Sequence, residues 1–171
     1  MQVTNSTSHG NYQVNSDNSY IMDPDNEMVS MRRGGRGNQS VILQYQDDTE
    51  WVFLNDKPQE RFCGFLYLQK ALKESNISTI QAAENKITIH DRKIIYLSQY
   101  CGEKKLDFME SGKYMNELSI LAKTVGFTDM LAYANLRLKD EIVYVFDTEK
   151  SSFDKSVREK IDSFKIYFIF G

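Results

Sequence analysis

The chain contains 171 residues and carries a formal net charge of −3, with 26% charged and 41% hydrophobic residues. This composition is ordinary for a soluble globular protein, and the length is sufficient for one domain with a substantial core. The negative net charge argues against a nucleic-acid-binding protein that depends on bulk electrostatics. No apolar run approaches the ~18 residues of a membrane span.

The two cysteines, Cys63 and Cys101, lie far apart and form no CxxC pair. They are therefore predicted to be reduced, half-buried thiols in a reducing compartment. The N-terminus lacks the apolar core of a Sec-type signal peptide. We expect a protein that is cytoplasmic or is delivered to a host cell by another route.

The first 26 residues are rich in Asn and Ser and poor in aliphatic side chains. Such a segment buries too little apolar surface to offset the entropy lost on ordering, so residues 1–26 are predicted to form a disordered polar tail. His9, within this segment, is expected to be solvated. Residues 27–171 are predicted to form a single domain.

The next elements alternate between strand and helix patterns. A short strand at 28–31 precedes a glycine-rich run with Gly34, Gly35 and Gly37, which is also typical of a flexible linker or hairpin turn. Residues 41–45 and 51–54 predict a β-hairpin. Pro58 then begins a helical pattern that continues through Lys73, and residues 76–83 are expected to be a connection.

The second half repeats this alternation. Residues 86–90 and 93–98 predict another hairpin, and the segments 106–109 and 114–125 predict helix, ended by Gly126. A third hairpin follows at 136–138 and 142–146, then a helical pattern at 151–165 and a β-prone run at 165–170. The predicted fold class is α+β: an antiparallel sheet with a crossing helix, followed by a helix and a further hairpin.

Three polar residues flank the third hairpin. Asp129 and Asn135 precede its first strand, and Asp147 ends its second strand. Because the hairpin brings its two ends together, we expect Asn135 and Asp147 to lie close to each other, with Asp129 on the loop before them. A carboxylate can accept a proton from a hydroxyl group, and carboxylate and amide oxygens are suitable ligands for Mg²⁺. The alternative is that all three residues are helix caps and strand ends, where Asp and Asn are favoured for local reasons.

The order of these elements from about residue 27 to residue 153 resembles the superfamily of protein kinases and aminoglycoside phosphotransferases. The resemblance implies an N-lobe-like sheet, ATP and Mg²⁺ as cofactors, Asp129 as catalytic base, and Asn135 and Asp147 as metal ligands. It also implies that Gly34, Gly35 and Gly37 cover the nucleotide phosphates, and that the backbone at 98–101 is a hinge. Lys57 is the nearest candidate for the phosphate-binding lysine, although it is more often a surface lysine. Glu60 and Glu74, on the helix that follows, are expected to be solvated.

Two departures from the family pattern separate the functional hypotheses. The strand at 51–54 contains no lysine, and only 24 residues follow Asp147, whereas a kinase C-lobe needs far more. We therefore predict a degenerate kinase-like module that binds a nucleotide or a protein partner, such as an effector delivered by a bacterium. An active minimal ATP- and Mg²⁺-dependent phosphotransferase is the first alternative. An unrelated α+β protein-interaction domain is the second.

Overall fold

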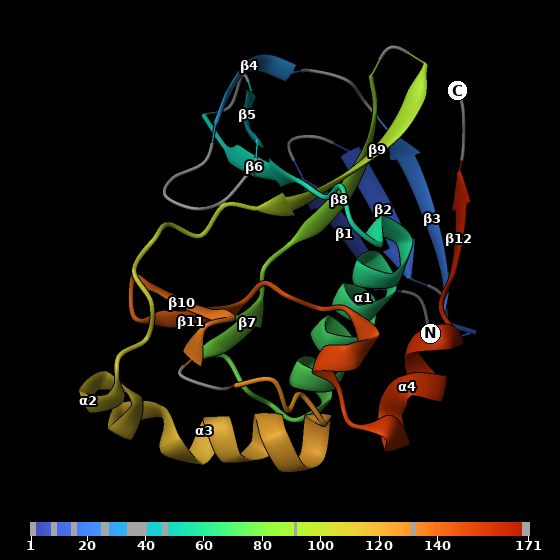
Figure 1. Cartoon of the computed structure of the whole chain (residues 1–171). Helices are drawn as coiled ribbons and strands as arrows, with labels where there is room; N and C mark the ends of the chain where they lie inside the picture. Colours follow the sequence, from blue (N-terminus) through green and yellow to red (C-terminus); the bar gives the residue numbers. More distant parts are fainter. Residues whose placement is uncertain are drawn as a thin grey trace. The chain divides into compact units, whose positions relative to one another are not determined.

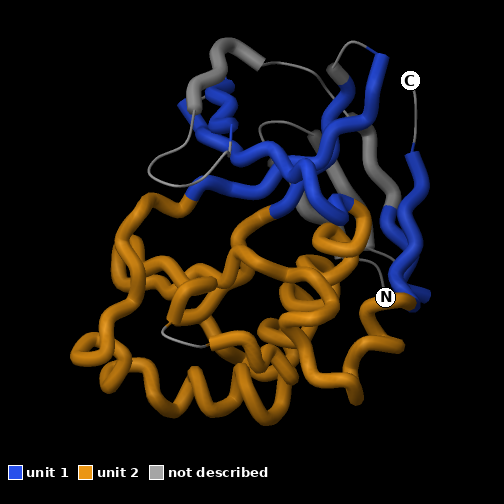
Figure 2. The backbone as a smooth tube through the Cα atoms, viewed as in Figure 1, with its two compact units in different colours: residues 1–58, 85–100, 163–171 blue, residues 59–84, 101–162 orange. Residues whose placement is uncertain are grey.

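The computed structural model describes residues 3–7, 10–14, 17–24, 28–33, 41–45, 48–90, 92–130 and 133–168. The fold is mixed α+β, as predicted. The chain divides into two compact units (Figure 2). Unit 1 comprises Met1–Pro58, Asn85–Tyr100 and Ser163–Gly171, and unit 2 comprises Gln59–Glu84 and Cys101–Asp162.

Unit 1 contains a five-stranded antiparallel sheet of order β4-β5-β6-β9-β8 (Figure 1). Its strands are β4 (Met28–Arg33), β5 (Val41–Tyr45), β6 (Glu50–Phe53), β8 (Asn85–His90) and β9 (Lys93–Gln99). The strands predicted near 28–31, 41–45, 51–54, 86–90 and 93–98 are thus confirmed. Period-2 alternation places the buried residues Leu43, Tyr45, Trp51 and Leu97 on one face, where they form a hydrophobic cluster.

A buried lysine lies against this cluster. Lys86 is 1% exposed, and its Nζ lies 3.5 Å from the centroid of the Tyr45 ring and 4.8 Å from that of Trp51. The electron-rich faces of aromatic rings attract a cation, and the attraction is strongest where water is excluded. The aromatic residues of the cluster therefore contribute to the solvation of this charge as well as to packing.

The second sheet of unit 1 has the order β1-β2-β3-β12. Strands β1 (Val3–Thr7), β2 (Gly10–Val14) and β3 (Ser19–Pro24) are antiparallel neighbours, and β12 (Lys165–Phe168) pairs with β3 in parallel. Strands β1, β2 and β3 lie within residues 1–26, where a disordered tail was expected, whereas β12 lies in the run predicted to be β-prone at 165–170. The difference has a physical reason: β3 pairs with a strand more than a hundred residues away in sequence, and local composition does not reveal such a partner.

Unit 2 contains most of the helical residues. Helix α1 (Pro58–Glu74), most of which belongs to this unit, buries Phe62, Phe65, Leu66, Tyr67, Leu68 and Leu72. Helix α2 (Phe108–Ser111) leads through a 3₁₀ turn to α3 (Met115–Ile120), which continues as a π-helical turn over Leu121–Val125. Gly126 follows with φ 86°, the left-handed conformation predicted for the residue that ends this helix.

A small mixed sheet completes unit 2. Strands β10 (Leu136–Lys139) and β11 (Ile142–Val145) are antiparallel, and β7 (Ile80–Ala82) pairs with β11 in parallel. The prediction of a plain connection at 76–83 is therefore wrong at Ile80–Ala82, a strand too short to show a period. Beyond β11, a 3₁₀ turn (Lys150–Ser152) leads to α4 (Lys155–Asp162). Phe153 makes edge-on contacts with Phe127 and Tyr67, with ring centroids 5.4 and 5.6 Å apart.

The pairing of β3 with β12 leads to a testable prediction. Tyr20 on β3 is 0% exposed, whereas Tyr167 on β12 of the same sheet is 54% exposed. Truncating a buried aromatic side chain removes its packing and leaves a cavity. We expect Tyr20→Ala to lower the free energy of unfolding by about 3–5 kcal/mol, and the matched control Tyr167→Ala by less than about 1 kcal/mol. Denaturant unfolding followed by circular dichroism measures both values; equal effects would contradict the order assigned to residues 17–24.

Candidate functional site

The β10–β11 hairpin brings the predicted site residues Asn135 and Asp147 to the same end of a small sheet. Lys139 pairs with Ile142, so the loop contains only Asp140 and Glu141, whose φ angles are 52° and 64°. Two central residues with positive φ define the type I′ turn, whose twist matches that of paired strands. At the open end of the hairpin, the Phe146 amide donates a hydrogen bond to the Asn135 carbonyl at 3.3 Å. Asp147 is the next residue along the chain.

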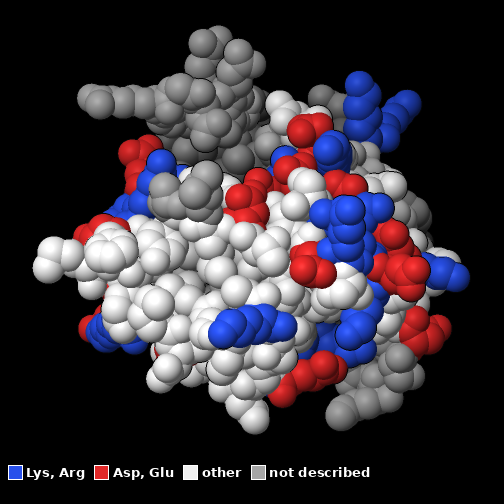
Figure 3. Space-filling view, turned by 60° about the horizontal axis from the view of Figure 1, so that its bottom comes forward, with Lys and Arg blue, Asp and Glu red and all other residues white. Residues whose placement is uncertain are grey.

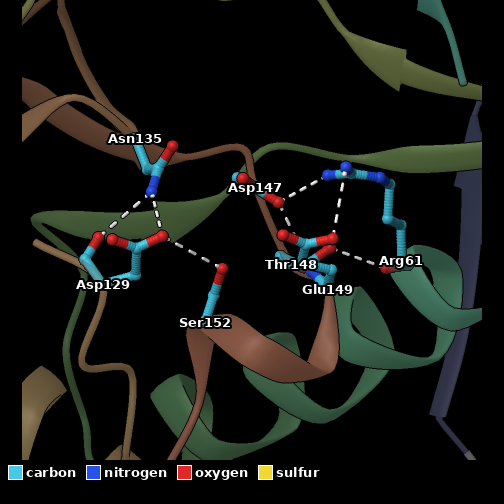
Figure 4. A network of polar contacts seen from close by, with 7 residues as sticks. All are labelled: Arg61, Asp129, Asn135, Asp147, Thr148, Glu149 and Ser152. Atoms are coloured by element: carbon cyan, nitrogen blue, oxygen red, sulfur yellow. Dashed lines mark hydrogen bonds and ion pairs between the residues drawn. The ribbon is translucent and has the colours of Figure 1, made fainter. Parts of the chain in front are cut away.

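Asp129 and Asn135 are in direct contact. The Asn135 Nδ2 group donates to Asp129 Oδ2 at 2.8 Å and to the Asp129 carbonyl at 3.2 Å (Figure 4). The Ser152 hydroxyl donates to the same carboxylate oxygen at 3.4 Å. Tyr133, which precedes Asn135 by two residues, has φ 52°, an uncommon backbone conformation for a bulky side chain. The structure thus brings together two predicted residues and adds Ser152, which no feature of the sequence had marked.

Asp147 instead faces a cation from α1. Its Oδ1 lies 2.5 Å from Arg61 Nη1, and Arg61 Nη2 lies 3.5 Å from Glu149 Oε2 (Figure 4). The three side chains are 19–21% exposed. Burial raises the pKa of Asp147, and the Arg61 guanidinium offsets part of that effect by favouring the carboxylate. The contact with the guanidinium favours the ionised form of Asp147 over the neutral acid.

The segment after β11 approaches α1 closely at two further points. The Thr148 hydroxyl donates to the Arg61 carbonyl at 2.6 Å. Gly64 lies about one helical turn after Arg61 on α1. The Thr148 carbonyl oxygen lies 1.8 Å from the position that a Cβ atom of Gly64 would occupy. Only glycine permits this approach. Gly64 and Arg61 therefore fix the segment that carries Asp147 against the helix, and neither was identified from the sequence, because their partners lie more than eighty residues away.

The chemical capacity of the site follows from these contacts. Asp129 is exposed and can accept a proton, and Asn135 holds it in one orientation. Asp147 and Glu149 share a guanidinium. Within the described residues, no group of three or more His, Cys, Asp or Glu side chains is arranged to hold a metal ion. The arrangement therefore pairs an available carboxylate with a second carboxylate whose charge is already compensated by Arg61.

The contacts described above do not involve Lys57, Glu60 or Glu74. Lys57 is exposed, has φ 48° and belongs to unit 1, whereas Asp129, Asn135 and Asp147 belong to unit 2. Gly34, Gly35 and Gly37 lie outside the described residues, as does His9. Glu74 is exposed, as expected. Glu60 lies 3.9 Å from Lys150, which also pairs with Asp162 at 3.0 Å.

Both cysteines are free thiols, as predicted. Burial raises the pKa of Cys63 to about 11 and that of Cys101 to about 12. Since the thiolate is the reactive form, both thiols have low nucleophilic reactivity at neutral pH. Neither thiol is a candidate nucleophile.

Comparisons with known proteins do not assign the chain to a family. No protein-family model matches it, and no curated protein sequence matches it. In the part of the chain that the structure describes, none of the helices has both the length and the apolar character needed to cross a lipid bilayer.

The contact at Gly64 gives a paired prediction. Alanine is normally the better helix former, but a Cβ at Gly64 would collide with the backbone of Thr148. We expect Gly64→Ala to destabilise the protein by about 2–3 kcal/mol. The control is Gly112→Ala, where φ is −56° and no atom lies within 4 Å of the added methyl group. That variant should be neutral or up to about 1 kcal/mol more stable. Denaturant unfolding of both variants measures the two changes in the free energy of unfolding. A Gly64→Ala protein as stable as the wild type would disprove the close approach of Thr148 to Gly64.

Proposed function

We propose that the chain is a kinase-like module that does not transfer phosphate and that acts by binding a protein partner. The kinase-like part of this proposal is supported by the order of elements. A three-stranded meander, β4–β5–β6, is followed by α1, by the β8–β9 pair, and then by a hairpin that has Asp129 and Asn135 before it and Asp147 after it. The resemblance is one of order and of a few polar residues.

The main support for the absence of catalysis is that the Arg61 guanidinium pairs with both Asp147 and Glu149. In a phosphotransferase of this type, the acid at the position of Asp147 binds Mg²⁺, which neutralises the phosphates. A divalent ion beside Asp147 would face the positive charge of Arg61. Two unit charges 4 Å apart interact by about 4 kcal/mol at the effective dielectric of a partly buried site. Arg61 thus supplies the positive charge that a metal ion would otherwise supply. Its charge would also repel a metal ion and weaken metal binding at Asp147.

The binding of a partner is supported by an exposed apolar surface on unit 2. Phe108 and Met109 on α2 are 84% and 89% exposed, and Met115 at the start of α3 is 54% exposed. The side of unit 2 that carries α2 and α3 shows a broad surface with few charged side chains (Figure 3). Large apolar side chains exposed in this way are typical of protein-interaction sites. Because the side chains project from the helix, they fit a partner that offers an apolar pocket.

One observation favours the alternative of an active phosphotransferase. The hydrogen bond between Asn135 and Asp129 places a proton acceptor beside a possible metal ligand. Asp129 is exposed, so an acceptor hydroxyl could reach it. In this alternative, Asn135 would hold Mg²⁺ through its carbonyl oxygen, and Asp147 would have to release Arg61 before it could bind the metal.

A transfer assay separates the two functions. With radiolabelled ATP and Mg²⁺, we expect neither ATP hydrolysis nor transfer to protein or small-molecule acceptors, and no Mg²⁺-dependent rise in melting temperature. Asp129→Asn should behave as the wild type in each measurement. The alternative is correct if the wild type turns over ATP and Asp129→Asn abolishes that activity, while the control Glu159→Gln, an exposed acid on α4, retains it.

A further inference from the structure

One edge of the second sheet of unit 1 is open in the part of the chain that the structure describes. In the strand order β1-β2-β3-β12, the last strand, β12, has β3 on one side, and none of the described strands pairs with its other side (Figure 1). The unpaired side of an edge strand presents backbone N–H and C=O groups that can pair with another chain. β12 is therefore a candidate surface for the addition of a further strand.

The pairing with β3 identifies which backbone groups of β12 point outward. The Lys165 N–H donates to the Asn18 carbonyl at 3.1 Å, and Lys165 lies opposite Ser19 in the parallel register. Alternate residues of a strand in a parallel ladder direct both of their backbone groups to the same side. Lys165 and Tyr167 therefore bind β3, whereas the N–H and C=O groups of Ile166 point away from β3.

The side chains of β12 do little to prevent pairing at this edge. Proteins commonly protect an open edge with charged side chains, proline or a bulge. β12 has one charged side chain, Lys165 at its first position, followed by Ile166, Tyr167 and Phe168, and Tyr167 is 54% exposed. The opposite edge of the sheet is β1, whose sequence, VTNST, is mostly polar. Of the two edges, β12 is the better suited to pairing through apolar side chains.

We propose that β12 pairs with β12 of a second copy of the chain, in antiparallel orientation about a twofold axis between the two Ile166 residues. In this register the outward N–H and C=O groups of each Ile166 bond to those of the other, as in a hydrogen-bonded pair of an antiparallel ladder. The same residue thus supplies both halves of the contact, which a closed twofold dimer requires. The half-buried Ile166 side chains become neighbours and remove further apolar surface from water.

Charge complementarity favours this register. Each Lys165 lies opposite Tyr167 of the second copy, and the two side chains project to the same face of the joined sheet. Both side chains are exposed in the single chain, so the lysine ammonium can lie over the tyrosine ring. A register centred on Lys165 would instead place two lysines opposite each other, where like charges repel.

The association state of the full chain tests the proposal. Two strands of this length bury little surface, so the dimer should be weak and reversible. Sedimentation velocity from about 1 to about 500 µM should show a shift from monomer to dimer, because mass action favours association at high concentration. In hydrogen exchange, the Ile166 amide should be protected only at high concentration. The Lys165 amide, which is bonded within one chain, should be protected at both extremes.

Two substitutions at one exposed position test the register. Tyr167→Lys places a lysine opposite Lys165 at both symmetry-related positions, and should weaken dimerisation at least about tenfold. Tyr167→Glu places a carboxylate there, and should dimerise at least as tightly as the wild type. Ile166→Pro removes the outward N–H and should abolish dimerisation. The control Phe108→Ser alters an exposed side chain of unit 2 and should dimerise as the wild type does.

Several outcomes would overturn the proposal. The first is a monomer throughout the concentration range. The second is equal weakening by Tyr167→Lys and Tyr167→Glu, which would indicate a different register; these two variants decide the question if Ile166→Pro fails to fold. The third is loss of the dimer in Phe108→Ser, which would place the contact on α2. The dimer and the partner-binding surface proposed above involve different units, so either can fail while the other stands.

Discussion

The contact between α1 and the segment after β11 determines what the candidate site can do. The Thr148 carbonyl lies so close to Gly64 that no side chain fits between them, and the Thr148 hydroxyl binds the Arg61 carbonyl. With the backbone held there, Asp147 and Glu149 flank Thr148 and both reach the Arg61 guanidinium. The ion pairs are therefore a consequence of backbone packing. For Asp147 to bind a metal ion, this segment would have to release its contacts with α1.

The same packing divides the polar residues around the hairpin into two sets. Asn135 and the buried Ser152 both donate to the exposed Asp129 carboxylate, and Asp147 and Glu149 bind Arg61. The first set retains an accessible carboxylate. The second has its charge compensated by a residue of the chain itself. An internal guanidinium is a permanent cation, since arginine does not lose its proton in proteins. The occupancy of a metal site depends on the metal concentration, whereas the Arg61 side chain is always present.

The sequence predicted the elements with strong periodic patterns and missed those defined by distant partners. The helix beginning at Pro58, the hairpins and the end of the helix at Gly126 follow from hydrophobic period and turn chemistry, both of which are local. Strands β1, β2 and β3 were missed because polar strands give a weak pattern and because β12, the partner of β3, lies at the other end of the chain. The sequence predicted that Asn135 and Asp147 lie close together at the ends of the hairpin; in the structure Asn135 contacts Asp129, and Asp147 contacts Arg61. No local sequence pattern identified Arg61, because its role depends on the contact between α1 and Asp147, which follows β11 and lies 86 residues later in the chain.

The central claim is that Arg61, and not a metal ion, balances the charge of Asp147 and Glu149. The most direct measurement is the free energy of unfolding of the wild type and Arg61→Met as a function of pH, with and without Mg²⁺, with Lys73→Met on the same helix as control. Burial raises the pKa of Asp147, and removal of Arg61 should raise it further. A carboxyl whose pKa is higher in the folded state destabilises the fold above that pKa and ceases to do so as the pH falls through it. We therefore predict that Arg61→Met loses about 1–2 kcal/mol at pH about 7, less than that at pH about 5, and that Mg²⁺ leaves the wild type unchanged. An Arg61→Met protein as stable as the wild type at neutral pH, or a wild type stabilised by Mg²⁺, would contradict this account.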